Sequence, residues 1–117
     1  MKHTLSNEVK KAIEHNKPVL ALESTILSSG MPYPQNLDFF HKTEKICYEN
    51  GVVPATIAII KGEIQVGLNN NHAEYITKSK NIKKISKREL GVCLQKKYSG
   101  ATTVSSTSHI AHSLGIK

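Results

Sequence analysis

The sequence has no tryptophan and only two cysteines among its 117 residues. Cys47 and Cys93 lie far apart and match no CxxC or Cys/His metal spacing, so we predict two buried free thiols rather than a disulfide or a zinc site. Long apolar runs are also absent: the longest uncharged apolar stretch is residues 51–60, whereas a membrane span needs about 20 residues. Residues 1–17 contain no apolar signal-peptide core. These absences predict a soluble, cytoplasmic protein.

Acidic residues are scarce, because 9 Asp and Glu stand against 16 Lys and Arg, which gives a net charge of +7. The whole excess lies in residues 78–97, which hold eight basic residues and a single acid, Glu89. Such a segment favours anionic partners, and one interpretation is a small basic module that binds RNA or nucleotides through Lys78 to Lys97. Aromatic residues argue against nucleic acid as the partner, since they make up 5% of the chain and only Tyr98 borders the segment.

Three of the predicted helices have clear start signals. Ser6 is an N-cap candidate for a helix that ends before Pro18 and has Leu5 among its apolar positions. Asn36 is a candidate cap for a helix that runs to about residue 51, and Ser86 has the capping-box spacing to Glu89. Two further helices are predicted over residues 70–78 and about 105–114. In the helix after Asn36 we expect one shared apolar face, made of Phe39, Phe40, Thr43, Ile46 and Cys47.

Strands are predicted at residues 19–22, 56–60, 63–66 and 82–85. The first of them, VLAL, is typical of a strand buried on both faces of a parallel sheet. Lys61 and Gly62 indicate a hairpin between the second and third, and residues 28–35 are expected to form a loop. The alternation of helices and strands predicts an α/β fold with a mainly parallel sheet flanked by helices. Because so small a number of strands would leave the edges of the sheet uncovered, we expect the chain to be an incomplete fragment of a larger α/β domain.

Glu23 is the first candidate site residue, because it follows a predicted strand and open α/β sheets bind ligands at the carboxyl ends of their strands. A partly desolvated carboxylate there suits a general acid, and a solvated strand-end glutamate is the alternative. Residues 100–107, GATTVSST, place small hydroxyl residues before a helix, where they either bind phosphate or only cap the helix. Lys84 and its basic neighbours either bind phosphate oxygens or form a solvated surface.

Five segments occur in an order and at a spacing that resemble one family. They are ALESTILSSGMPYPQN (21–36), VPATIAII (53–60), VGL (66–68), KISKREL (84–90) and GATTV (100–104). Together they resemble the pseudouridine-5'-phosphate glycosidases, also known as the indigoidine synthase A-like proteins. The resemblance runs from about residue 18 to residue 117, and five segments in register are far more specific than any one of them.

The resemblance implies an enzyme that reversibly converts pseudouridine 5'-phosphate and water to uracil and ribose 5-phosphate by breaking a carbon–carbon glycosidic bond. In the implied mechanism a lysine forms a Schiff-base adduct with the opened ribose, and Glu23 donates and accepts protons. Lys84 corresponds to a substrate-binding lysine, and Val104 to a position that contacts substrate through its backbone. The family further implies Mn²⁺ as cofactor and a cytoplasmic homotrimer.

The sequence also departs from the family pattern. The family's nucleophilic lysine and metal-binding aspartate lie downstream of a segment that would follow Lys117, so residues 1–117 are expected to be the amino-terminal portion of a single glycosidase domain, inactive alone. Ser29 stands where the family commonly has histidine, and His109 and His112 fall where its last helix is usually apolar. No other residue of the sequence pattern would complete a metal site with these two histidines, which argues against a metal ion bound between them. The alternatives are the basic RNA- or nucleotide-binding module and a degenerate remnant that folds poorly.

Overall fold

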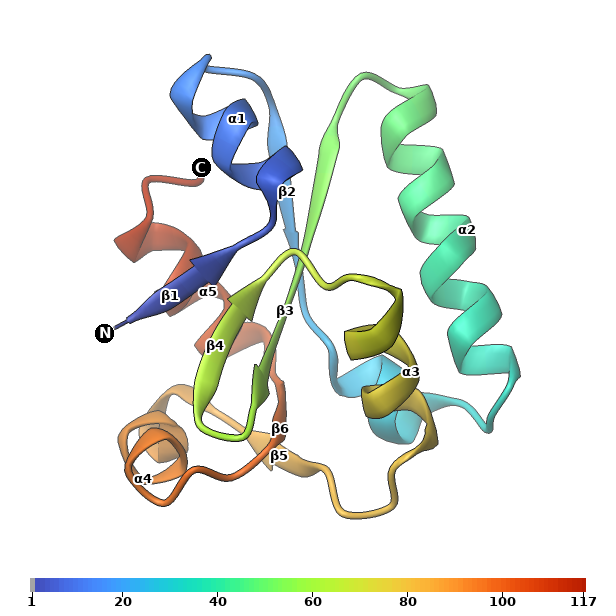
Figure 1. The fold of residues 1–117 in the computed structure, drawn as a ribbon, viewed down its shortest axis with the longest axis vertical. Coiled ribbons are helices and arrows are strands. Elements are labelled where there is room, and N and C mark those ends of the chain that lie inside the picture. The colour runs from blue at the N-terminus through green and yellow to red at the C-terminus, as the bar shows by residue number, and fades with distance from the viewer. Residues whose placement is uncertain (1) are drawn as a thin grey trace.

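The centre of the sheet is its longest strand, β3 (Val53–Ile60), in a computed structural model that describes residues 2–117 (Figure 1). The other strands are β1 (His3–Leu5), β2 (Val19–Leu22), β4 (Glu63–Val66), β5 (Lys83–Ile85) and β6 (Gly100–Thr102). The order across the sheet is β1-β4-β3-β6-β5, and β2 also pairs with β3. The pairings β1–β4, β2–β3 and β5–β6 are parallel, whereas β3–β4 and β3–β6 are antiparallel. The predicted α/β class with a mainly parallel sheet is confirmed, with β3 supplying both antiparallel contacts.

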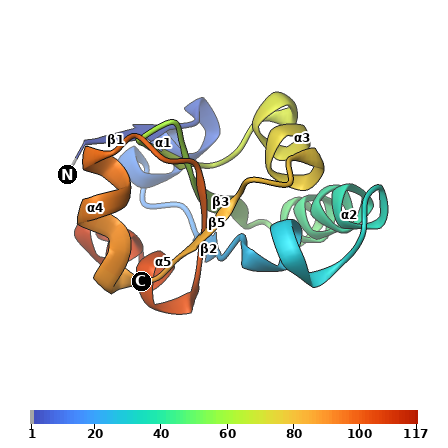
Figure 2. The same ribbon diagram turned by 90° about the horizontal axis from the view of Figure 1, so that it is seen from below.

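Helices cover both faces of this sheet (Figure 2). One face carries α1 (Asn7–Glu14), α4 (Leu90–Gln95) and α5 (Val104–Ser113), and a 3-10 turn, η2 (Lys87–Glu89), leads into α4. The other face carries the π-helix η1 (Ile26–Gly30), α2 (Gln35–Glu49) and α3 (Asn70–Lys78). The result is a three-layer arrangement in which the end of β6 contacts both the segment after β2, through Thr25, and the end of β5, through Ile85.

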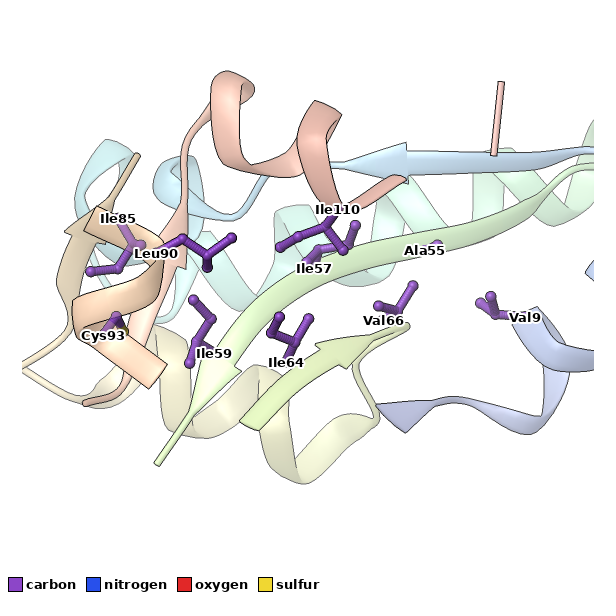
Figure 3. Packing of buried hydrophobic residues seen from close by; sticks show 10 residues of the cluster. All are labelled: Val9, Ala55, Ile57, Ile59, Ile64, Val66, Ile85, Leu90, Cys93 and Ile110. Carbon is purple, nitrogen blue, oxygen red and sulfur yellow. The ribbon is translucent and has the colours of Figure 1, made fainter. Parts of the chain in front are cut away.

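Alternation along β3 divides the core into two clusters. Ala55, Ile57 and Ile59 are fully buried on the face of α1, α4 and α5, where Figure 3 shows them with Ile64 and Ile110. On the opposite face, Ala58 belongs to a cluster with Leu27, Phe40, Leu68, Ala73 and Ile76. Burial on both faces explains the continuous apolar sequence of β3.

The local signals for helix starts and for the hairpin are confirmed. The Ser6 side chain accepts a hydrogen bond from the Val9 N–H at 3.2 Å, and Ser86 with Glu89 forms the predicted capping box. Lys61 and Gly62 have φ values of 49° and 82°, which is the left-handed geometry of a two-residue hairpin between β3 and β4. Cys47 and Cys93 are buried and free, as predicted.

Two predictions for the helices are wrong in detail. Leu5 lies in β1, because Ser6 starts α1 only after Leu5 has paired with Val66 of β4. Asn36 lies inside α2 and is buried, where its amide donates to the carbonyls of Leu27 and Thr77 at 2.7 and 3.0 Å. It therefore ties α2 to η1 and α3 instead of capping a helix.

Predictions about burial and about the short elements also need correction. β2 is not buried on both faces, since none of its four residues is fully buried and β3 is its only partner among the described strands. Phe39 and Ile46 are exposed on α2, whereas Phe40 and Cys47 face the core. Part of the predicted loop, residues 28–30, belongs to η1, and the strands β1 and β6 were not predicted. In residues 2–117 no helix combines the length and the hydropathy that a membrane crossing requires.

Candidate active site

The carboxyl ends of β2 and β6 meet at the middle of β3. The Ser24 N–H donates to the Thr102 carbonyl at 3.1 Å, and the Thr102 N–H donates to the Ser24 hydroxyl at 2.8 Å. Both hydroxyls also donate to the carbonyl of Ile57, each at 2.6 Å. Because Ser24 and Thr102 are fully buried, these bonds are shielded from water and fix the two strand ends against each other.

Glu23 precedes this junction by one residue and is half-buried. One carboxylate oxygen accepts from the Thr25 N–H at 3.1 Å and the other from the Ile26 N–H at 3.4 Å, at the start of η1. Glu23 also lines a pocket of about 150 Å³ whose other walls are mainly apolar; they are Leu22, Ile26, Leu27, Phe39, Phe40, Thr43 and Thr56. The structure therefore places the carboxylate in a fixed orientation in the wall of a small pocket.

Lys84 lies in β5, opposite Ala101 of β6, which in turn pairs with Ala58 of β3. Its neighbour Ile85 is buried in the cluster of α1, α4 and α5, so alternation directs Lys84 to the other face of the sheet. This is the face on which the Glu23 pocket opens, because that pocket shares Leu27 and Phe40 with the Ala58 cluster. Lys84 is exposed, and the described residues show no direct ion pair between it and Glu23.

Val104 is the first residue of α5, directly after the N-cap Thr103. Its side chain is 70% exposed, so its contribution to a site would be its backbone N–H, one of the helix-start donors that have no partner within the helix. Thr25 links this region to η1, since its hydroxyl donates to the Thr102 carbonyl at 3.0 Å. The two helix starts that follow β2 and β6 are thus held side by side.

Ser24 and Thr102 are the residues that sequence reasoning missed. Both stand within segments that carried the family resemblance; Ser24 was assigned no role, and Thr102 was considered only as one of the hydroxyl residues of 100–107 that bind phosphate or cap a helix. Nothing local in the sequence indicates that residues 24 and 102 pair. Their contact depends on the register with which β2 and β6 pair with β3.

The remaining departures from the family pattern lie away from the core. Ser29 is exposed, and its hydroxyl donates to the Thr25 carbonyl at 3.1 Å. His112 is exposed and His109 is only partly buried, so the last helix carries both imidazoles without desolvating either completely. Among residues 2–117, no group of three or more His, Cys, Asp or Glu side chains is placed to hold a metal ion.

Outside this site, Glu44 is the group whose ionisation is most strongly perturbed. It lines a hollow of about 230 Å³ between α1 and α2 with Glu8, Tyr48, Asn69 and other residues. Burial raises the pKa of Glu44 to about 7, and the negative charge of Glu8 contributes further in the same direction. Since the folded state binds this proton more tightly than the unfolded chain, stability should fall as pH rises from about 4.5 to about 7.

We therefore expect Glu44→Gln to stabilise the fold selectively at higher pH. Urea unfolding should give a gain of about 1 kcal/mol at pH 8, after allowance for partial solvent screening, and almost none at pH 4, where Glu44 is protonated in both states. Glu74→Gln is the matched control, because Glu74 is exposed and joined only to Lys78, at 3.7 Å. Equal gains for the Glu44 variant at both pH values would contradict the assignment.

The fold and the site define a class: an α/β protein with a glutamate at the junction of converging strand ends. The sequence matches the family described as indigoidine synthase A like protein over residues 8–117. The chain belongs to this family, as the sequence resemblance predicted. One relative, pseudouridine-5'-phosphate glycosidase of Caldanaerobacter subterraneus subsp. tengcongensis, is 56% identical over 113 residues, which is 97% of this chain and 37% of the relative. The enzyme of the same name from Brachyspira hyodysenteriae is 54% identical over 113 residues, again 97% of this chain and 37% of the relative.

Two solved structures carry the same fold. Prealnumycin C-glycosynthase AlnA, in complex with ribulose 5-phosphate, matches with a TM-score of 0.86 and 36% identity over 97% of this chain and 36% of that protein. An indigoidine synthase A-like protein from Thermotoga maritima matches with a TM-score of 0.81 and 30% identity over 86% of this chain and 34% of that one. The chain thus spans a little over a third of the length of the proteins it matches.

Proposed function

We propose that this chain forms the glutamate-bearing part of a pseudouridine-5'-phosphate glycosidase, which reversibly cleaves its substrate to uracil and ribose 5-phosphate. The position of Glu23 carries the proposal: its carboxylate is held by two backbone N–H groups and lines a pocket beside the point where two strand ends converge. The names of the 56% and 54% identical relatives support the substrate, and the sugar phosphate bound to AlnA supports the substrate class.

Each of the three site residues has a distinct proposed task. Glu23 transfers the proton that leaves or joins the base as the glycosidic bond breaks or forms, since its carboxylate orientation is already fixed. Lys84 supplies a mobile cation for the phosphate group, on the sheet face where the Glu23 pocket opens. Val104 supplies a backbone N–H at the start of α5, where the helix dipole favours an anion.

Mn²⁺ belongs to the chemistry that the family resemblance implies. The described residues do not fit it, because residues 2–117 bring no three His, Cys, Asp or Glu side chains together. A carboxylate pair such as Glu8 and Glu44 lies apart from the Glu23 pocket. The tasks proposed for Glu23, Lys84 and Val104 therefore include no step through a metal.

The isolated chain is expected to be inactive. None of the three residues assigned a task is the lysine nucleophile of the implied mechanism, and loss of a nucleophile costs several orders of magnitude in rate. The test is to incubate the chain with uracil, ribose 5-phosphate and Mn²⁺ and to measure pseudouridine 5'-phosphate by chromatography and mass spectrometry. Turnover at a rate similar to that of the Caldanaerobacter relative would show that these 117 residues suffice.

Assays of the site residues need a complete domain. We therefore design a fusion protein, called the chimaera. Residues 1–117 replace the matched 37% of the Caldanaerobacter relative, and the remaining sequence of that relative follows Lys117. The chimaera is expected to form pseudouridine 5'-phosphate from uracil and ribose 5-phosphate. Our proposal includes a homotrimer in the cytoplasm, and light scattering on the chimaera tests its assembly.

Lys84→Ala in the chimaera should raise the KM for ribose 5-phosphate about tenfold and change kcat little, because a phosphate contact remote from the reacting bond binds ground state and transition state alike. Lys45→Ala is the matched control, since Lys45 is an exposed lysine on α2. Steady-state kinetics with ribose 5-phosphate as the varied substrate give both constants. An unchanged KM in the Lys84 variant would remove Lys84 from phosphate binding.

A further inference from the structure

The outer edge of β2 has the composition of a core strand but not its burial. All four residues, VLAL, are apolar, yet none is fully buried and Leu20 is 47% exposed. By contrast, six of the eight residues of β3 are buried. Among the described strands β2 pairs with β3 alone, so its other edge presents unpaired backbone groups beside exposed apolar side chains.

Hollows lie at both ends of this edge. At the amino end of β2, a cavity of about 490 Å³ is lined by Pro18, Val19, Ile116 and Lys117 among others. At the carboxyl end lies the pocket of about 150 Å³ that contains Leu22 and Glu23. Figure 2 shows β2 between α5 with the carboxyl terminus on one side and η1 with α2 on the other. The edge therefore lies between two helical layers.

The α2 side of this opening is also apolar. Phe39, Thr43 and Ile46 are spaced four and three residues apart, which puts them on one side of the helix. Phe39 and Thr43 line the Glu23 pocket, and Phe39 and Ile46 are 38% and 60% exposed. Leu22 lines this pocket as well, and alternation along β2 puts Leu20 on the same side of the strand. We call Leu20, Phe39, Thr43 and Ile46 the β2–α2 face, and exposed apolar residues gathered around a pocket are typical of interaction sites.

We propose that the β2–α2 face docks an apolar β-strand that runs parallel to β2 and belongs to the part of the family domain outside the residues matched here. The match covers only 37% of the Caldanaerobacter relative, so the larger part of that protein lies outside the matched residues and is long enough to supply such a strand. Lys117 and Val19 line the same hollow, at the amino end of β2. A strand that continues from there follows β2 in the same direction.

This direction has a consequence for the site. A strand rises about 3.3 Å per residue, so a partner of four or five residues would reach from Val19 to Glu23. Its carboxyl end would then lie beside the Glu23 pocket, at the position from which α/β sheets present functional side chains. The docked strand would cover Leu20 and add a new wall to the pocket. The inference rests on family membership and not on the reaction, so its test measures accessibility.

The test compares thiol labelling of single positions in the isolated chain and in the chimaera. Leu20→Cys reports on the β2–α2 face, and Val92→Cys on α4 is the matched control, because Val92 is also about half exposed, at 53%. We expect Cys labelling at position 20 to slow at least tenfold in the chimaera and labelling at position 92 to stay unchanged. The buried Cys47 and Cys93 report whether each protein is folded.

Equal labelling at position 20 in both proteins, with Cys47 and Cys93 protected, would overturn the proposal. Rapid labelling of Cys47 and Cys93 would show that the chimaera is unfolded. In that case the complete Caldanaerobacter relative is labelled instead, with a cysteine at the position aligned with Leu20. Fast labelling of that cysteine overturns the proposal, and slow labelling supports it. Protection of position 20 in the isolated chain that rises with concentration, together with a doubled mass, would assign the face to a second copy and also overturn it.

Discussion

Glu23→Gln in the chimaera is expected to lower kcat for pseudouridine 5'-phosphate formation by about two to four orders of magnitude, the usual contribution of a positioned general acid or base. Glutamine has nearly the same shape and fills the same pocket, but it cannot donate and accept the transferred proton as a carboxyl group does. KM should change little, because Glu23 acts on the reacting bond rather than on the phosphate. The measurement is steady-state kinetics with product detection by mass spectrometry.

Glu23 also has a structural task, and the experiment must separate the two. Its carboxylate accepts from the Thr25 and Ile26 N–H groups at the start of η1, and loss of a cap of this kind costs about 1 kcal/mol. Urea unfolding of Glu23→Gln should therefore show only a small loss of stability beside the large loss of rate. Glu44→Gln is the matched control and should keep full activity. Full activity in the Glu23 variant would remove Glu23 from the mechanism.

Local chemistry accounts for the parts of the fold that could be predicted from the sequence. The Ser6 cap and the Ser86 box lie within three residues of the N–H groups they satisfy, and the Lys61-Gly62 hairpin joins adjacent strands. The predicted strand 56–60 lies within β3 (Val53–Ile60), which starts three residues earlier and is buried because helices cover both of its faces. In each case the partners are neighbours in sequence, or the signal is a continuous apolar run within one element.

Contacts between distant residues account for the parts that could not be predicted. β6 has three residues, too few to show a period, and it forms because Ala101 pairs with Ala58 and Lys84 on either side. The buried bonds between Ser24 and Thr102 join residues 78 positions apart. For β2 the composition predicted burial, but burial depends on neighbouring strands, and only β3 is present beside it in the described chain.

The same distinction applies to the candidate site. Glu23 could be proposed from its place after a strand, and the structure puts it at a pocket. The roles of the site residues stay predictions: those of Glu23 and Lys84 came from their sequence context and the family resemblance, and that of Val104 from the resemblance alone. Alternation along β5 does place Lys84 on the sheet face of the Glu23 pocket. That placement could not be read from the sequence because it depends on the register between β5 and β6.

Gly67→Ala is expected to destabilise the fold by about 2–4 kcal/mol, from backbone strain and overpacking together. Gly67 has φ of 90°, in the left-handed region, where it turns the chain after β4 beneath the start of α1. A Cβ there would collide with the Ser6 hydroxyl and come within 3.0 Å of the Val9 side chain. Ser6 cannot move freely, because its N–H donates to Val66 and its hydroxyl caps α1.

Gly91→Ala is the matched control for this substitution, with the opposite expected sign. Gly91 lies in α4, and a Cβ there would meet no atom within 4 Å. Alanine should therefore stabilise the fold by about 0.5–1 kcal/mol through its higher helix propensity. Urea unfolding monitored by circular dichroism gives both values. If Gly67→Ala left the unfolding midpoint unchanged while Gly91→Ala raised it, the close approach of β4 to the start of α1 would be wrong.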